Sequence, residues 1–170
     1  MNVGAEKPED YGLYFAWGET VGYTGDTSDG RSFNWASYKW CNGSNNTLTK
    51  YCTSSDYGTV DNKTVLDPED DAAHVNWGGS WRMPTSEEIL ELLDKTTSEW
   101  ATLNGINGRK FTSKASGNSI FLPAAGTRSG IAVWSQSFVG YYWSSSLYVK
   151  YPDNASYLSF NSDKLELRAI

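Results

Sequence analysis

The fold is decided at Gly78-Gly-Ser-Trp-Arg-Met-Pro84, which runs directly into Thr85-Ser-Glu-Glu88. Trp81 is a large amphipathic anchor, and Arg82 carries a planar guanidinium that can bind carboxylates or carbonyls. Pro84 restricts the backbone immediately before the next element begins. We therefore expect structural roles for Trp81, Arg82 and Pro84.

A helix is predicted over residues 85–96. Thr85 and Glu88 have the spacing of a capping box, so both should be structural. Apolar residues then recur at helical spacing and should face the core: Ile89, Leu90, Leu92 and Leu93. The acidic residues of the other face are assigned to solvent rather than to catalysis: Glu87, Glu88, Glu91 and Asp94.

A second helix is predicted over residues 67–77, with Asp67 as N-cap and Pro68 at its first position. Ala72, Ala73 and Val75 should pack against the core. The acidic run at its start lacks the Asp-x-Asn-x-Asp-Gly rhythm of a calcium loop, so an acidic first turn is favoured over a metal site.

Short strands are predicted in the last third of the chain, over residues 119–123, 140–146, 155–160 and 164–168. Their alternation of side chains predicts an antiparallel meander in which Tyr141, Trp143 and Ser145 share one face. Trp143 is expected to be structural.

The first part of the chain is less regular. Residues 11–17 form an aromatic, strand-like run, and residues 41–66 are rich in Asn, Thr, Ser, Gly and Tyr. Because the second segment also contains aromatics and cysteine, we expect a long ordered surface excursion rather than disorder.

Length and charge narrow the classes of function. A chain of 170 residues fits a single domain, 1–170. The net charge of −6 argues against nucleic acid as a partner. No stretch approaches the ~18 apolar residues of a membrane span, so we expect no membrane insertion by this segment. Met1 directly before Asn2-Val-Gly is what an interior segment of a longer, exported precursor would give.

The chain is rich in aromatic residues, with eight Trp and eleven Tyr beside sixteen Gly. Aromatics among Gly, Ser and Asn form rigid contact surfaces on loop-rich scaffolds, which is typical of recognition proteins. Most of the Trp residues, five or six of the eight, are expected to be structural.

Cys41 and Cys52 flank a polar loop, and the sequence leaves open whether they form a disulfide. Together with one histidine, His74, they make a weak case for structural zinc, which usually takes four ligands. A cysteine nucleophile would have only His74 as a partner. No metal or other cofactor is predicted.

The chain resembles the Fibrobacter succinogenes major paralogous domain, which is common in surface proteins of gut Bacteroidetes. The resemblance spans nearly the whole chain, in the stretches that begin at Asn2, Glu9, Asp70, Trp77, Phe121, Gly140 and Tyr157. Trp-Arg-Met-Pro-Thr is also shared with the wider formylglycine-generating-enzyme-like group. The resemblance implies an α+β, C-type-lectin-like fold: a small twisted antiparallel sheet, two helices and long ordered loops.

Two departures from this family lie at the ends of the chain. Members usually continue upstream into a further strand and downstream into a Gly-Phe-Ser-Val-Arg strand, whereas this chain ends at Arg168-Ala-Ile. One or both terminal strands are therefore expected to be missing or replaced, which would leave an exposed sheet edge.

The leading hypothesis is a non-enzymatic recognition or adhesion domain, at the cell surface or secreted, that binds a protein or a glycan. Its contacts are expected in the C-terminal third, where aromatic and hydrogen-bonding side chains alternate. The candidate contact residues are Arg128, Trp134, Tyr142, Tyr148, Lys150, Tyr151, Asp153, Asn154 and Tyr157.

Two alternatives follow from further resemblances. Residues 124–168 look like the variable region of ligand-binding proteins diversified by retroelements, which use the same scaffold and a Tyr-Trp-Ser-Ser-Ser pattern. A formylglycine-generating-enzyme-like oxidase would need a late cysteine pair, yet no Cys follows Cys52. A calcium-bridged sugar site is not predicted, because no Trp-Asn-Asp follows Tyr151-Pro-Asp-Asn154.

Overall fold

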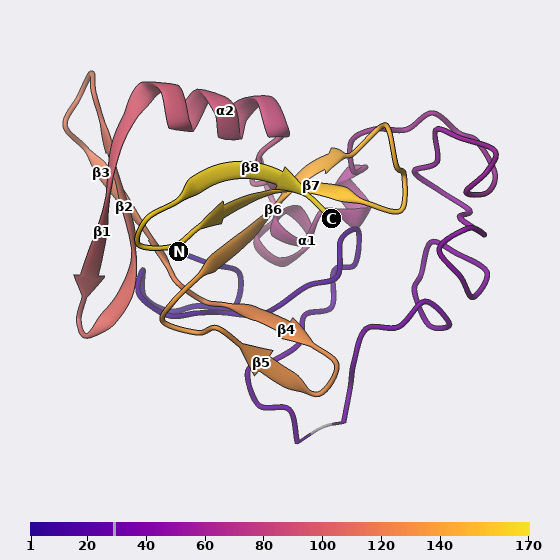
Figure 1. Ribbon diagram of the computed structural model, residues 1–170, viewed down its shortest axis with the longest axis horizontal. Helices are drawn as coiled ribbons and strands as arrows, with labels where there is room; N and C mark the ends of the chain where they lie inside the picture. The colour runs from indigo at the N-terminus through magenta and orange to yellow at the C-terminus, as the bar shows by residue number, and fades with distance from the viewer. Residues whose placement is uncertain (29) are drawn as a thin grey trace.

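The computed structural model describes residues 1–28 and 30–170 and shows an α+β domain built mostly from antiparallel sheets (Figure 1). Three sheets contain strands in the orders β1-β2-β3, β4-β5 and β6-β7-β8. The helices are the 3-10 helix η1 (Pro68–Asp70), α1 (Ala72–Trp77) and α2 (Ser86–Lys95). The strands are β1 (Thr96–Leu103), β2 (Ile106–Ser113), β3 (Ser119–Pro123), β4 (Thr127–Ser129), β5 (Ala132–Trp134), β6 (Gly140–Leu147), β7 (Ala155–Phe160) and β8 (Leu165–Ala169).

The predicted capping box is present at the start of α2. The Thr85 hydroxyl accepts a hydrogen bond from the Glu88 amide, and the Glu88 carboxylate accepts one from the Thr85 amide at 2.9 Å. Helix α2 contacts β6, β7 and β8, and Ile89 is buried in a cluster with Leu158 and Phe160 of β7. Leu90 is exposed, so its predicted core position is wrong. The cap thus fixes where the helix begins and which face it presents to the sheet.

We expect Thr85→Ala to lower the free energy of unfolding by about 1 kcal/mol, because the Glu88 amide at the start of the helix loses the hydroxyl that caps it. Urea denaturation would measure this loss. Ser86→Ala is the matched control, since the Ser86 hydroxyl bonds only the exposed Glu87 carboxylate, and its effect should stay within about 0.5 kcal/mol. Equal losses in the two variants would show that the cap does not stabilise the helix.

The predicted helix over residues 67–77 is wrong as a single element. The backbone at Asp71 is extended and divides the segment into η1 and α1, and Asp71 rather than Asp67 caps α1 by accepting from the amides of Ala73 and His74. Asp67 makes no capping bond because its carboxylate binds Lys50 and Lys63. Within α1, Ala72 and Ala73 are buried as expected, but Val75 is exposed.

The predicted meander is present as β6-β7-β8, but the predicted strand over residues 119–123 is β3, which pairs with β2 in a different sheet. The hairpin of β1 and β2 was not predicted. Its register places Leu103 opposite Ile106 across a two-residue turn of Asn104 and Gly105, both with positive φ. An Asn-Gly pair between two strands is a strong hairpin signal, so this element was readable in the sequence.

The aromatic run 11–17 is not a strand beyond one bridge, in which Tyr14 and Tyr23 exchange both backbone hydrogen bonds. It is instead attached to β6 by indole side chains. Trp17 Nε1 donates to the Ser144 carbonyl and Trp143 Nε1 donates to the Phe15 carbonyl, at 2.8 and 2.9 Å. The structural role expected of Trp143 is therefore a cross-chain hydrogen bond as well as packing.

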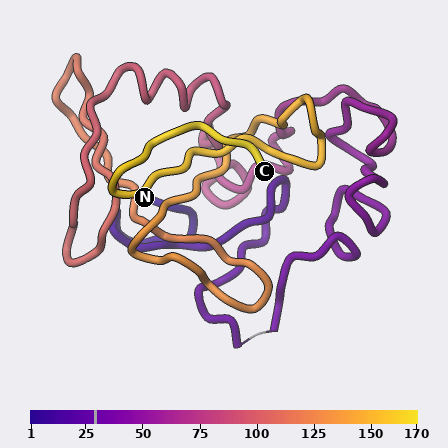
Figure 2. Tube along the Cα trace, in the orientation of Figure 1, coloured from indigo at the N-terminus to yellow at the C-terminus, as the bar shows by residue number. Residues whose placement is uncertain are grey.

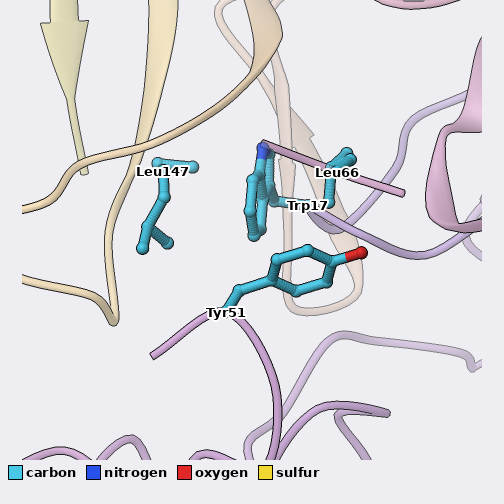
Figure 3. Packing of buried hydrophobic residues seen from close by; sticks show 5 residues of the cluster. Trp17, Tyr51, Leu66 and Leu147 are labelled. Atoms are coloured by element: carbon cyan, nitrogen blue, oxygen red, sulfur yellow. The ribbon is translucent and has the colours of Figure 1, made fainter. Parts of the chain in front are cut away.

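The excursion over residues 41–66 contains turns and isolated bridges, and it winds outward from the sheets in Figure 2. It is not purely surface, because Leu48, Tyr51 and Cys52 are buried. Tyr51 packs edge to face on Trp17 in a cluster with Leu66 and Leu147 (Figure 3). The excursion thus has its own attachment to the core.

A second core cluster joins the two three-stranded sheets and α2. It is formed by Ile89, Phe111, Ala124, Leu158 and Phe160. Across the described part of the chain, no helix has the length and apolar character needed to cross a bilayer.

The number of tryptophans that are at least half-buried agrees with the five or six that were expected to be structural. Five of the eight are buried or half-buried, namely Trp17, Trp35, Trp40, Trp100 and Trp143, while Trp77, Trp81 and Trp134 are exposed.

Candidate functional site

The loop between β6 and β7, residues 148–154, is closed by its own backbone. The Tyr148 amide donates to the Asn154 carbonyl, the Tyr151 amide to the Tyr148 carbonyl, and the Asn154 amide to the Tyr151 carbonyl, at 2.9–3.0 Å. These three bonds close the loop through main-chain atoms alone. We call residues 148–154 the recognition loop, after the role that the sequence analysis expects of them.

The aromatic side chains of the recognition loop lie at the surface. Tyr148 and Tyr151 are 37% and 43% exposed, and their ring centroids are 6.0 Å apart. The Lys150 ammonium lies 5.1 Å from the centroid of the Tyr151 ring, within cation–π range. The loop therefore presents two partly exposed phenol rings and a positive charge side by side.

The excursion supports this loop from outside. Asn45 Nδ2 donates to the Asp153 carboxylate at 2.9 Å, and Thr53 Oγ1 donates to the Val149 carbonyl at 2.9 Å. Burial, and then the charge of Asp153, raise the pKa of the Tyr57 phenol. Figure 1 shows the β6–β7 connection next to the outer turns of the excursion. The supporting residues Asn45, Thr53 and Tyr57 were not predicted.

A buried charge network anchors the base of the excursion. The Asp70 carboxylate is 0% exposed and accepts from Lys39 Nζ at 3.0 Å, Lys50 Nζ at 2.6 Å and the Tyr51 hydroxyl at 2.6 Å. Burial alone would raise the pKa of Asp70, but these hydrogen bonds outweigh it and lower that pKa. The Tyr51 hydroxyl also accepts a hydrogen bond from the Asp67 amide, so this phenol links the Asp70 carboxylate to the backbone at Asp67.

The acidic run at residues 67–71, where the sequence analysis weighed a calcium site against a helix start, belongs to the same network. Among the described residues, the only group of His, Cys, Asp and Glu close enough to share an ion is Asp67, Glu69 and Asp70. Lys50 Nζ lies 2.6 Å from oxygens of both aspartates and 3.9 Å from Glu69. Lys39 and Lys63 also pair with these aspartates, so three ammonium groups lie against the three carboxylates.

The two cysteines are free thiols, so the disulfide that the sequence left open is not formed. Cys41 Sγ donates to the Trp35 carbonyl at 3.0 Å, and Cys52 Sγ donates to the Ser54 carbonyl at 3.1 Å. Each thiol closes a local turn. His74 lies elsewhere, with Nδ1 3.1 Å from the Trp81 carbonyl.

The structure brings together five of the nine predicted contact residues, all in the recognition loop: Tyr148, Lys150, Tyr151, Asp153 and Asn154. Arg128 and Trp134 lie on the β4–β5 hairpin. That hairpin joins the sheet through a bridge between Gly126 and Gly140 at the start of β6, whereas the recognition loop leaves its far end. The hairpin and the recognition loop are thus attached at opposite ends of β6.

Two of the predicted contact residues are interior, which corrects their assignment. The Tyr142 ring stacks on Phe160 at 5.8 Å, its hydroxyl donates to the Pro123 carbonyl, and burial raises its pKa. Tyr157 is buried between Tyr141 and Trp143. The period-2 pattern of β6 and β7 did not reveal this, because every residue of β7 is buried.

Of the three residues before α2 that were expected to be structural, two make contacts that fit that role. Arg82 binds Glu88 through both terminal nitrogens, at 2.6 and 2.7 Å, and also donates to the Met83 carbonyl. The Pro84 carbonyl accepts from the Ser145 amide of β6 at 2.8 Å. Trp81, by contrast, is 61% exposed, so burial does not support the structural role expected of it.

No protein-family model, curated protein or solved structure matches this chain.

Proposed function

We propose that this chain is a recognition domain with a C-type-lectin-like fold, related to the Fibrobacter succinogenes major paralogous domain, that binds a protein through the recognition loop. The support for the fold is the short antiparallel sheet β6-β7-β8, covered by α2 and bordered by long irregular segments. The sequence stretches that carry the family resemblance support the relationship and an extracellular or surface location.

The observation that carries the proposed function is a closed loop with outward-facing tyrosines. Its shape depends on backbone bonds and on the excursion, so little conformational entropy is lost when a partner binds. Tyrosine supplies a large, rigid contact area with few rotatable bonds, and exposed rings beside a cation suit a polar protein surface. Tyr148, Lys150 and Tyr151 would make the central contacts.

The diversified ligand-binding protein is a narrower form of the same proposal. It would use the same loop, and it is supported by the fact that the side chains of Tyr148, Lys150 and Tyr151 take no part in closing the loop backbone.

We expect the double variant Tyr148→Ala/Tyr151→Ala to weaken ligand binding by at least about 30-fold, because paired aromatic contacts of this kind contribute about 2 kcal/mol or more. The purified chain would first be screened against an array of bacterial and host ectodomains and an array of glycans. Surface plasmon resonance on the strongest hit would then give Kd for the wild type and the variant.

Phe138→Ala is the matched control, since Phe138 is an exposed aromatic outside the recognition loop. Its Kd should stay within threefold, and both variants should keep the wild-type melting temperature. If the chain bound only glycans in the screen, the proposal of a protein partner would be wrong. Unchanged affinity in the double variant would place the binding surface elsewhere.

A further inference from the structure

Two exposed tryptophans meet beside the Arg82–Glu88 ion pair. Trp77 ends α1 and is 39% exposed, and Trp81 follows four residues later at 61%. Their ring centroids are 5.2 Å apart with planes at 70°, which makes an aromatic corner open to solvent. We call Trp77 and Trp81 the indole corner.

The backbone holds this corner in place. Gly78 and Gly79 both have positive φ, which turns the chain sharply after α1, and the Trp81 amide donates back to the Gly78 carbonyl at 3.3 Å. The Trp81 carbonyl in turn lies 3.1 Å from His74 Nδ1. The corner is therefore preformed, although the Trp81 ring gains little from burial in the fold.

A shallow hollow of about 380 Å³ lies next to the corner, lined by Ser80, Trp81, Arg82, Pro84 and Glu88. Its volume is in the range of sites for small ligands. Trp81 contributes an indole to its lining, and Arg82 and Glu88 contribute a paired guanidinium and carboxylate.

The charge balance of that pair selects the class of ligand. Arg82 and Glu88 neutralise each other through two hydrogen bonds, so neither offers an uncompensated charge to an ionic ligand. A guanidinium with five N–H donors and a carboxylate with about four acceptor sites still have capacity for neutral hydroxyl groups. The negative face of an indole attracts the weakly positive C–H groups of a saturated ring.

We propose that the indole corner and the Arg82–Glu88 pair form a binding site for an uncharged saccharide, separate from the recognition loop. A pyranose ring stacks on Trp81, and its hydroxyl groups bond the ion pair and Ser80. Trp77 borders the Trp81 ring on one side of the site. The site shares no residue with the recognition loop.

The test uses titration of the intact chain with neutral hexasaccharides, namely cello-, manno-, xylo-, laminari- and maltohexaose, followed by calorimetry and by tryptophan fluorescence. At least one should bind, and Trp81→Ala should weaken that binding tenfold or more. Trp81→Tyr, which keeps an aromatic face, should recover most of the affinity. Raising NaCl from 50 to 500 mM should change Kd less than twofold, because the ligand is uncharged.

Trp134→Ala is the matched control, because Trp134 is equally exposed but lies on the β4–β5 hairpin. It should leave saccharide affinity unchanged, and Tyr148→Ala/Tyr151→Ala should do the same. The proposal is overturned if none of the five hexasaccharides binds, if Trp81→Ala binds as well as the wild type, or if only anionic oligogalacturonate binds.

Discussion

Asp70→Ala should lower the free energy of unfolding by about 3–5 kcal/mol, the cost of removing one partner from a buried ion pair. The substitution leaves Lys50 and Tyr51 without the carboxylate that they both contact at 2.6 Å. Guanidinium denaturation followed by tryptophan fluorescence would measure the loss. Because Tyr51 belongs to the core cluster with Trp17, the fluorescence should also report loosening of the excursion.

Glu69→Gln provides the control, since that carboxylate is exposed and lies 3.9 Å from the same ammonium. Its effect should stay below about 1 kcal/mol. A similar small loss for Asp70→Ala would mean that the network does not anchor the excursion.

The pH dependence of stability follows from the same carboxylate. Its pKa is lowered in the folded chain from an ordinary value of 3.8, so its stabilising effect is complete above that pH. The effect is lost as the pH falls further, through the folded pKa. The stability of Asp70→Asn should therefore vary less than that of the wild type between about pH 4 and pH 2.

Phe160→Ala should cost about 3–5 kcal/mol through the cavity it leaves. Phe160 is buried, and its ring contacts Phe111 and Trp100 from the β1-β2-β3 sheet as well as Tyr142 from its own sheet. Calorimetry should show a lower melting temperature and a broader transition, because this ring joins the two sheets.

Phe138→Ala removes the same ring from an exposed position and should change stability by less than about 0.5 kcal/mol. A single sharp transition in Phe160→Ala, at the wild-type temperature, would contradict the role of this ring.

The elements with local signals could be predicted from the sequence. The capping box at Thr85 and Glu88 and the strands β6, β7 and β8 depend on neighbouring residues and are present, although burial alternates only in β8. The β1–β2 hairpin had an equally local signal, which lies in its turn residues Asn104-Gly105 and not in its hydrophobic pattern.

The remaining features depend on contacts between distant residues. Tyr142 and Tyr157 look like surface residues in sequence, but the first is covered by the N-terminal segment, where Asn2 donates to its hydroxyl. The pairing of Asp70 with Lys39 and Lys50 likewise joins residues 31 and 20 positions apart. Local periodicity carries no information on such pairs, so the sequence could not show that Tyr142 and Tyr157 are interior.

The way in which the recognition loop closes bears on how freely its side chains could be exchanged. Its three internal hydrogen bonds join main-chain atoms only, so substituting Tyr148, Lys150 or Tyr151 would alter the exposed chemistry while the peptide path persists. One frame could thus display many alternative surfaces, and related chains with the same path could each fit a different partner.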